Sequence, residues 1–204
     1  MSKPTRDVEH YFSSAPKSED KFGLVRASLC GSNFEFLTSS SVFSKRRVDL
    51  GTRLLIESME LPRAGCVLDI GCGYGAVGIA AAKFNCALRV VMSDVNMRAV
   101  RLAKRNLELN GVTNAEVRYG YLYEPVFGSK FDCILSNPPV SAGMDTVKAI
   151  VQQAPKVMAS GASFQMVIRS KIGGKALPQL FSETFGNCGI LSRESGFRVL
   201  VGKL

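Results

Sequence analysis

The sequence contains little from which a metal centre or a thiol-based active site could be built. It has one histidine, His10, and six cysteines, no two of which form a C-x-x-C pair. Zinc sites and redox motifs depend on closely spaced Cys and His residues, so we expect no metal ligands. Cys72 lies among glycines without a basic neighbour, whereas a reactive thiolate needs one. The pattern therefore points away from metal and thiol chemistry.

Long apolar runs are also missing. No run approaches the ~20 residues that a membrane-spanning helix requires, and the first residues, Met1–Asp7, lack the apolar core of a signal peptide. There is no internal repeat or low-complexity tract. We expect a cytoplasmic protein with no membrane partner, and 204 residues are enough for one α/β domain with a full core.

Acidic residues are in the minority. Asp and Glu number 17 against 26 Lys and Arg, which gives a formal net charge of +9. The excess is spread along the chain rather than gathered in a tail. A diffuse positive charge favours a polyanionic partner such as RNA or DNA. The alternative is that the charge serves only to keep the protein soluble. The charge makes nucleic acid a candidate partner and leaves the oligomeric state open.

The most informative stretch that is present is Val67–Gly78. Its apolar start, Cys66–Ile70, predicts a buried strand; the glycines Gly71, Gly73 and Gly75 predict a tight turn; and Ala76–Phe84 is rich in helix formers. A strand, a glycine turn and a helix N-terminus together form a common ligand-binding unit. The glycine spacing alone does not identify the ligand, because it also satisfies the dinucleotide-binding pattern.

Asp69 helps to distinguish a dinucleotide from another ligand of this turn. It lies inside the predicted strand, where dinucleotide-binding proteins normally have an apolar residue. A carboxylate there would repel a pyrophosphate but would suit the cationic amino end of S-adenosylmethionine. The alternative is a structural Asp that accepts backbone N–H bonds.

A second carboxylate, Asp94, ends the next predicted strand. Acidic residues at this place bind ribose hydroxyls in doubly wound nucleotide-binding folds, through charge-assisted hydrogen bonds. The alternative is a helix N-cap, but Asn96 is better placed for that role.

Alternating strand and helix patterns predict an α/β fold: a doubly wound, mostly parallel, Rossmann-like sheet with helices on both faces. A small β-hairpin precedes it and an antiparallel hairpin closes it, so we expect an extension over residues 1–45 and the main domain over 46–204. The predicted strands are Leu24–Cys30, Asn33–Thr38, Cys66–Ile70, Ala87–Ser93, Ala115–Gly120, Phe131–Ser136, Ala162–Ile168, Asn187–Ser192 and Phe197–Leu204. The predicted helices are Lys45–Met59, Ala76–Phe84, Asn96–Asn110, Asp145–Ser160 and Ala176–Phe185, and the first hairpin turn is Gly31-Ser32.

Asn137-Pro138-Pro139-Val140 directly follows the fourth strand of the predicted sheet. Two prolines fix the backbone and cannot continue a strand ladder. A proline-rich turn is the structural alternative, since Asn-Pro also favours turns.

With Asp69-x-Gly71-x-Gly73-x-Gly75, Asp94 and Asn137-Pro138-Pro139 in this order, the chain resembles the class I S-adenosylmethionine-dependent methyltransferases. More narrowly, it is similar to the small-domain family that includes enzymes modifying the 2-amino group of guanine in small-subunit ribosomal RNA. His10-Tyr11-Phe12-Ser13 and Ser41-Val42-Phe43-Ser44-Lys45 resemble two stretches that precede the glycine turn in that family.

The resemblance implies roles for individual residues. Asn137, with Pro138 and Pro139, would receive the target amine, and the side-chain oxygen of Asn137 with the Pro138 carbonyl would accept its N–H bonds. S-adenosylmethionine would contact a set drawn from the glycine turn, the strand ends and one preceding loop: Phe43, Asp69, Gly71, Cys72, Gly73, Gly75, Asp94, Val95, Tyr121 and Asn137. Two residues depart from the family pattern, because Val140 replaces an aromatic residue and Tyr121 replaces an Asp or Asn.

The expected function is therefore methyl transfer to an exocyclic amine of a nucleobase, with guanine in small-subunit ribosomal RNA preferred. An adenine amine in DNA or RNA, or a glutamine amide in a protein, would need the same site. A noncatalytic RNA-binding module and a dinucleotide oxidoreductase are alternatives from other classes, and Asp69 opposes the last.

Overall fold

The computed structural model describes residues 22–39, 47–138, 143–171 and 174–204. The expected motifs around His10, Phe43, Pro139 and Val140 lie outside them. In chain order the elements are β1 Phe22–Leu29, β2 Ser32–Ser39, α1 Leu50–Ser58, β3 Gly65–Ile70, α2 Ala76–Phe84, β4 Leu88–Asp94, α3 Met97–Leu109, β5 Ala115–Tyr119, the 3-10 turn η1 Glu124–Val126, β6 Phe131–Ser136, α4 Met144–Gln153, the 3-10 turn η3 Ala154–Lys156, β7 Met158–Arg169, α5 Ala176–Phe185, β8 Gly189–Glu194 and β9 Phe197–Lys203.

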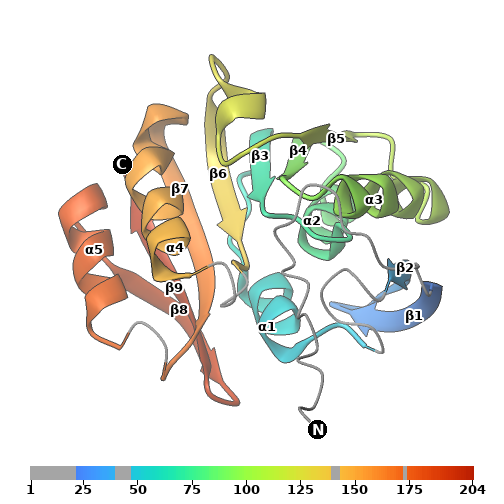
Figure 1. Cartoon of the computed structure of the whole chain (residues 1–204), viewed down its shortest axis with the longest axis horizontal. Coiled ribbons are helices and arrows are strands. Elements are labelled where there is room, and N and C mark those ends of the chain that lie inside the picture. The colour runs from blue at the N-terminus through green and yellow to red at the C-terminus, as the bar shows by residue number, and fades with distance from the viewer. Residues whose placement is uncertain (1–21, 40–46, 139–142, 172–173) are drawn as a thin grey trace, which may run out of the picture.

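A seven-stranded sheet organises the molecule, in the order β5-β4-β3-β6-β7-β9-β8 (Figure 1). The first five of these strands are parallel, whereas β9 is antiparallel to β7 and to β8. The doubly wound sheet with a terminal antiparallel hairpin is thereby confirmed.

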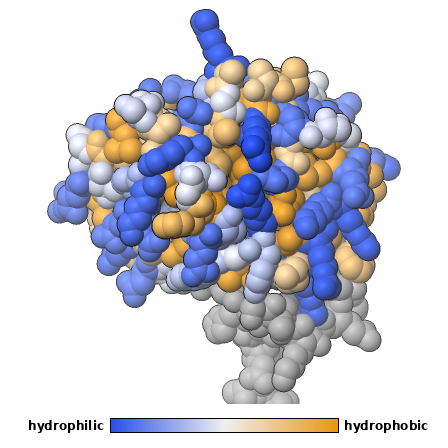
Figure 2. Space-filling model, turned by 90° about the horizontal axis from the view of Figure 1, so that it is seen from above, coloured by the Kyte–Doolittle hydropathy of each residue, from blue (hydrophilic) through white to orange (hydrophobic). Residues whose placement is uncertain are grey.

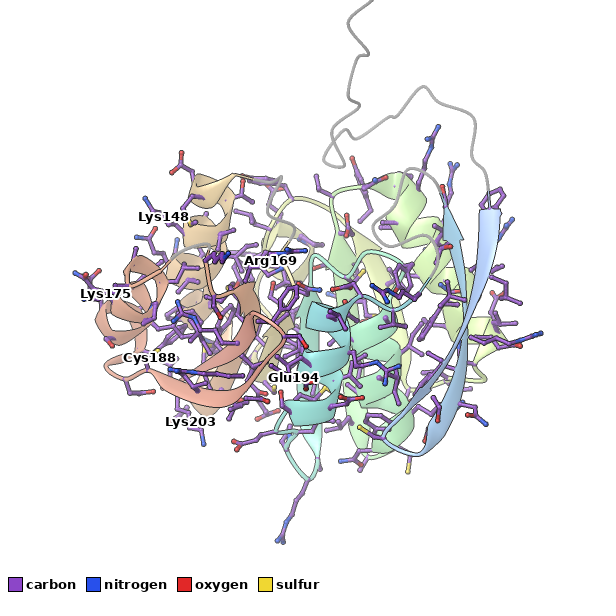
Figure 3. All side chains as sticks on the ribbon, turned by 90° about the horizontal axis from the view of Figure 1, so that it is seen from below. Lys148, Arg169, Lys175, Cys188, Glu194 and Lys203 are labelled. Carbon is purple, nitrogen blue, oxygen red and sulfur yellow. The ribbon has the colours of Figure 1, made fainter. Side chains whose placement is uncertain are left out.

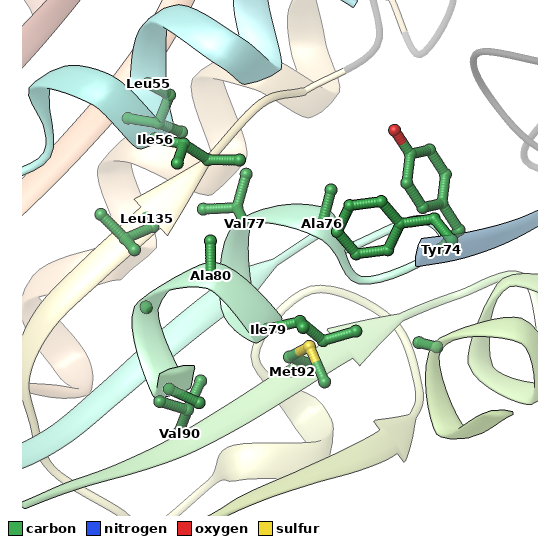
Figure 4. Packing of buried hydrophobic residues seen from close by; sticks show 14 of the residues in the cluster. Leu55, Ile56, Tyr74, Ala76, Val77, Ile79, Ala80, Val90, Met92 and Leu135 are labelled. Atoms are coloured by element: carbon green, nitrogen blue, oxygen red, sulfur yellow. The ribbon is translucent and has the colours of Figure 1, made fainter. Parts of the chain in front are cut away.

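Helices cover both faces of this sheet because its central strands are apolar on both sides. In β3, Val67 belongs to the core cluster under α1, α2 and α3, while the next residue, Leu68, belongs to the cluster under α4 and α5. Figure 4 shows the first cluster, where Leu55 of α1, Val77 of α2 and Leu135 of β6 come together. Because both faces of β3 are buried, the sheet has no solvent-exposed face at this strand.

The N-terminal hairpin packs against the helix layer rather than joining the main sheet. Its turn is Cys30-Gly31, with φ of 47° and 75°, so the predicted turn at Gly31-Ser32 was wrong by one residue. Positive φ at both turn positions is the geometry that two-residue hairpins favour. Phe34 and Phe36 of β2 are buried, and their rings are stacked.

Helix α1 begins later than predicted. Asp49 is its N-cap, and the side chain of Asp49 accepts hydrogen bonds from the backbone N–H groups of Gly51 and Thr52. Arg47 precedes the helix, while Lys45 and Arg46 lie outside the described residues. The expectation that basic residues open this helix was wrong, since an N-cap side chain must accept hydrogen bonds and a cation cannot.

The largest error concerns the end of α4. The prediction ran one helix from Asp145 to Ser160, but α4 ends at Gln153, Pro155 lies in η3, and β7 begins at Met158. Proline has no N–H for an α-helical hydrogen bond. Gly161, predicted to end the helix, lies within β7 with a φ of 75°, near a register shift between β6 and β7. It allows an irregularity in a strand.

The strand β8 is also shifted from the predicted 187–192 to 189–194, whereas the turn at Ser195-Gly196 is confirmed by positive φ at both residues. None of the helices in the described part of the chain is long and apolar enough to cross a membrane. Seen from above, hydrophilic side chains are spread over the surface among smaller apolar areas (Figure 2).

Candidate functional site

The carboxyl ends of the parallel strands bring the two main sequence motifs together. Asp69 of β3 is paired with Leu135 of β6, so the glycine turn after β3 and Asn137 after β6 follow the ends of two neighbouring parallel strands. The hydroxyl of Ser136 donates to the carbonyl of Ile70 at 3.1 Å, which fixes the strand ends to each other. We call this region the carboxyl end of the sheet. Binding sites of open α/β folds are found here.

The glycine turn leaves room for a ligand. Gly71 and Gly73 have φ of 71° and 57°, and a Cβ atom at either would meet no atom of the described residues within 4 Å. The turn is held by the N–H groups of Gly71 and Cys72, which donate to the carbonyl of Ser93 at 2.9 and 3.0 Å. Gly75 differs, because a Cβ there would meet Ile79 and Ala103. The first two glycines therefore border open space, and the third allows helix packing.

Asp69 has a structural role in the arrangement. Its side chain is 1% exposed, and Oδ2 accepts a hydrogen bond of 2.8 Å from the N–H of Gly78 in the first turn of α2. The N-cap of α2, Gly75, has no side chain for this duty. Burial raises the pKa of Asp69 to about 7, and the nearby Asp94 adds to that effect. Asp69 therefore accepts a backbone N–H bond, which is the structural role that its sequence position also allows.

Asp94 connects the second strand with the glycine turn. Its Oδ2 accepts from the N–H of Gly73 at 2.9 Å, and its Oδ1 accepts from the N–H of Asn96 at 2.8 Å. Burial raises the pKa of this carboxyl, while these hydrogen bonds oppose the rise. Asn96 is the N-cap of α3, as the sequence predicted. Asp94 therefore binds the glycine turn, and Asn96 rather than Asp94 caps α3.

Asn137 is held from one side. Its Nδ2 donates to Oγ1 of Thr52 at 2.8 Å, and its Oδ1 makes no hydrogen bond within the described residues. Pro138 is buried directly after it. The next two residues of the motif are outside the described part of the chain, as is Phe43.

The remaining candidates differ in their accessibility. Val95 is half-buried between Asp94 and Asn96, and Tyr121, in the turn after β5, is 49% exposed. The thiol of Cys72 is close to both site carboxylates, and burial together with their charge raises its pKa well above the ordinary value. Such a thiol is protonated at neutral pH and is no nucleophile. No metal-binding group of His, Cys, Asp and Glu is found among the described residues.

Two polar groups at this site were missed by the sequence analysis. The hydroxyls of Tyr74 and Ser93 are buried and have no hydrogen-bond partner in the described structure. Figure 4 shows the Tyr74 hydroxyl pointing away from the apolar cluster. Unpaired buried hydroxyls next to a turn with open space fit a polar ligand that would supply partners. The signal for Ser93 was available, since a small polar residue preceded Asp94 in an otherwise apolar strand.

Several exposed cations lie at or after the carboxyl end of β7, or on β8. Arg169, Lys171, Lys175 and Arg193 are exposed, and none forms an ion pair with another described residue. The guanidinium of Arg169 lies 5.0 Å from the ring centre of Phe197. That ring in turn packs beside Gly51 in the first turn of α1. Figure 3 labels Arg169, Lys148 and Lys175 in the half of the molecule that holds α4 and α5.

Comparison with known proteins now gives the family. Residues 33–201 match the model of the methyltransferase small domain. The chain belongs to the methyltransferase small domain family. The uncharacterized protein YbxB of Bacillus subtilis (strain 168) is 34% identical over 197 residues, which are 96% of this chain and 98% of YbxB. Ribosomal RNA small subunit methyltransferase C of Serratia proteamaculans (strain 568) is 29% identical over 171 residues, 82% of this chain and 48% of that protein.

A solved structure shows the same relation. The T. thermophilus 16S rRNA N2 G1207 methyltransferase (RsmC), in complex with AdoMet and guanosine, superposes with a TM-score of 0.81 at 26% identity, covering 93% of this chain and 52% of that one. The chain spans about half the length of these ribosomal RNA methyltransferases.

Membership in the methyltransferase small domain family decides between the two ligands of the glycine turn. The expected class, an S-adenosylmethionine-dependent methyltransferase with a Rossmann-like fold, is confirmed, and the dinucleotide oxidoreductase is excluded. Asp94 is hydrogen-bonded to the glycine turn, and the strand that precedes Asn137 is paired with the strand that precedes the turn.

Proposed function

We propose that this chain transfers a methyl group from S-adenosylmethionine to an exocyclic amine of a nucleobase, and that the acceptor is guanine in small-subunit ribosomal RNA. The observation that carries the proposal is that Asn137 and the open glycine turn follow the paired strands β6 and β3 at the carboxyl end of the sheet. Support for the acceptor comes from the relatives named for ribosomal RNA and from the structure with bound guanosine. Such an acceptor places the reaction in the cytoplasm.

Orientation is the main contribution of the proposed site to catalysis. An exocyclic amine is a poor nucleophile because its lone pair is delocalised into the base. The side-chain oxygen of Asn137 and the carbonyl of Pro138 can each accept one N–H bond, which turns the lone pair out of conjugation and toward the methyl donor. When bound, S-adenosylmethionine supplies an electrophilic methyl group: nitrogen donates its lone pair to carbon, and the carbon–sulfur electron pair stays on sulfur. The resulting ammonium then loses a proton to solvent.

The turn and the strand ends are proposed to hold the cofactor. The backbone of Gly71, Cys72, Gly73 and Gly75 faces its amino-acid end, and Asp94 with Val95 faces the ribose. Both oxygens of Asp94 already accept one backbone hydrogen bond, but a carboxylate oxygen has a second lone pair for a hydroxyl.

Three further residues complete the proposed cofactor site. Asp69 is buried, so it supports the turn through its hydrogen bond to the N–H of Gly78 rather than by direct contact with the cofactor. Tyr121 offers its exposed ring to the adenine, and Phe43 closes over the cofactor.

An RNA partner fits the charge of the surface next to Asn137. Cations that form no ion pair within the described structure can pair with phosphates, and Arg169 is linked through Phe197 to the helix that contacts Asn137. On the proposed division, residues 46–204 perform the chemistry and residues 1–45 form an extension.

The test is transfer of a labelled methyl group from S-adenosylmethionine to RNA. We expect label in small-subunit ribosomal RNA that becomes acid-soluble on RNase treatment, and only a small residual amount of it with Asn137→Ala. DNase-sensitive or protease-sensitive label would instead support an adenine or glutamine acceptor. A noncatalytic RNA-binding module would bind RNA and S-adenosylhomocysteine yet transfer no label to any of these acceptors.

A further inference from the structure

We propose that Thr52 and Asp49 are positioning residues that fix the orientation of the Asn137 amide; this inference rests on the proposed function, in which the Asn137 oxygen receives the target amine. The three side chains form one connected series. Nδ2 of Asn137 donates to Oγ1 of Thr52 at 2.8 Å, and Oγ1 of Thr52 donates to Oδ2 of Asp49 through a short hydrogen bond. Asp49 and Thr52 are 85 or more residues away from Asn137 in sequence, so the series connects α1 to the end of β6.

The chemical identity of each group decides the direction of every bond in the series. The Asp49 carboxylate can only accept, so the Thr52 hydroxyl must use its one proton to donate to it. That leaves the Thr52 oxygen with lone pairs alone for Asn137. The amide must then present its NH₂ group to Thr52, and its oxygen points the opposite way. An isolated amide could adopt either orientation with similar energy, and only one of them presents an acceptor to an incoming amine.

The surroundings keep the series rigid. Thr52 is 5% exposed, and Oδ1 of Asp49 accepts from the N–H groups of Gly51 and Thr52 at 3.0 and 3.1 Å. Asp49 therefore cannot rotate without uncapping α1. The position of α1 is itself fixed, because Leu55 and Ile56 are buried in the core. The helix cap and the orientation of Asn137 depend on the same carboxylate.

Three variants separate orientation from folding. Thr52→Val has nearly the same volume as wild type but has no hydroxyl, whereas Thr52→Ser keeps it. Asp49→Asn retains a good N-cap, since its Oδ1 can still accept from α1. Its NH₂ then donates to Thr52, which turns the Thr52 proton toward Asn137. The Asn137 amide is thereby reversed, and its NH₂ faces the target amine.

We expect Thr52→Val and Asp49→Asn to lower kcat about 10- to 100-fold, with the Kd of S-adenosylhomocysteine unchanged and Thr52→Ser near wild type. In an Asn137→Ala background, Thr52→Val should lower the residual kcat no further, because Thr52 acts only through that amide. Thermal denaturation of each variant shows whether it is folded.

Two outcomes would overturn the inference while leaving the proposed function in place. One is a wild-type kcat in folded Thr52→Val and Asp49→Asn. The other is an equal loss from Thr52→Val with and without Asn137, which would show a general structural effect. If wild-type protein methylates no RNA, the proposed function itself fails, and with it the inference.

Discussion

At the scale of single residues, the site contains carboxyl groups that are partly or fully removed from water. Asp69 is the clearest case, since it is nearly inaccessible, bonded to one backbone N–H and close to a second carboxylate. Burial disfavours the charged form of a carboxyl. The folded protein therefore retains the Asp69 proton up to about pH 7, while the unfolded chain releases it near the ordinary value.

This difference predicts how stability changes with pH. Where the folded state binds more protons than the unfolded state, stability falls as pH rises, so the contribution of Asp69 is lost between about pH 4 and pH 7. Relative to wild type, Asp69→Asn should gain roughly 1–4 kcal/mol between pH 5 and pH 8. Urea denaturation of both proteins at the two pH values measures this. An identical difference at both values would contradict the raised pKa.

The glycine turn allows a matched comparison. Gly73 and Gly111 both have positive φ, 57° and 65°, and a Cβ at either would meet nothing within 4 Å, but Gly111 follows α3 and is outside the site. Alanine at each should cost about 1–2 kcal/mol of strain. Only Gly73→Ala should weaken S-adenosylhomocysteine, about tenfold or more, because its methyl group occupies the space beside the turn. Calorimetric titration of both variants decides, and equal affinities would remove the cofactor from this place.

At the scale of elements, helix α3 holds the N-terminal hairpin through two asparagines one turn apart. Asn106 is fully buried; its Oδ1 accepts from the N–H of Leu37, and its Nδ2 donates to the carbonyls of Leu37 and Tyr74. Asn110 makes the equivalent pair of bonds with the backbone of Glu35. The amides thus occupy the positions that a neighbouring strand would take, and Asn106 also links the hairpin to the glycine turn.

Removing one amide should therefore loosen the hairpin. Asn106→Ala removes the hydrogen-bond partner of three backbone groups, the N–H and carbonyl of Leu37 and the carbonyl of Tyr74, each worth about 1 kcal/mol, so we expect a loss of roughly 3 kcal/mol. Asn110→Ala is the control. Because Asn110 is partly open to water, this substitution should cost only about 1 kcal/mol. Thermal denaturation with limited proteolysis of β1–β2 measures both. Equal small losses would mean that apolar packing of Phe34 and Phe36 alone holds the hairpin.

The elements also show what sequence patterns can predict. Buried strands and the helices α2, α3 and α5 were found within a few residues, because apolar periodicity and caps mark them directly. Asn106 was not recognised, since a polar residue in an amphipathic helix reveals nothing of a distant strand. The helix predicted to reach Ser160 failed because Pro155 and a strand pairing outweighed local propensity. Thr52 was missed for the same reason as Asn106, as its partner is distant in sequence.

At the scale of the whole molecule, the arrangement of charge follows the polarity of the sheet. Lys171 follows the carboxyl end of β7, at the same end of the sheet as the proposed site, whereas Lys156 precedes the amino end of that strand. Both are exposed lysines. A phosphate backbone that reaches Asn137 passes the first and not the second.

This pair tests the proposed RNA surface. Lys171→Glu should raise KM for RNA several-fold at moderate salt and lower the slope of log affinity against log salt by about 1, with kcat unchanged. Lys156→Glu carries the same change in net charge and should leave both quantities near wild type. Similar effects of the two substitutions would indicate attraction by net charge alone.

In the proposed reaction, Asn137 holds an amino nitrogen of a base beside a methyl donor in the glycine turn. Nucleoside mass spectrometry of small-subunit ribosomal RNA, after reaction with methyl-deuterated S-adenosylmethionine, tests it most directly. We predict that the label is found on the exocyclic nitrogen of guanosine with wild type and is strongly reduced with Asn137→Ala. Label on a ring atom or on a ribose, or undiminished labelling by Asn137→Ala, would contradict the account.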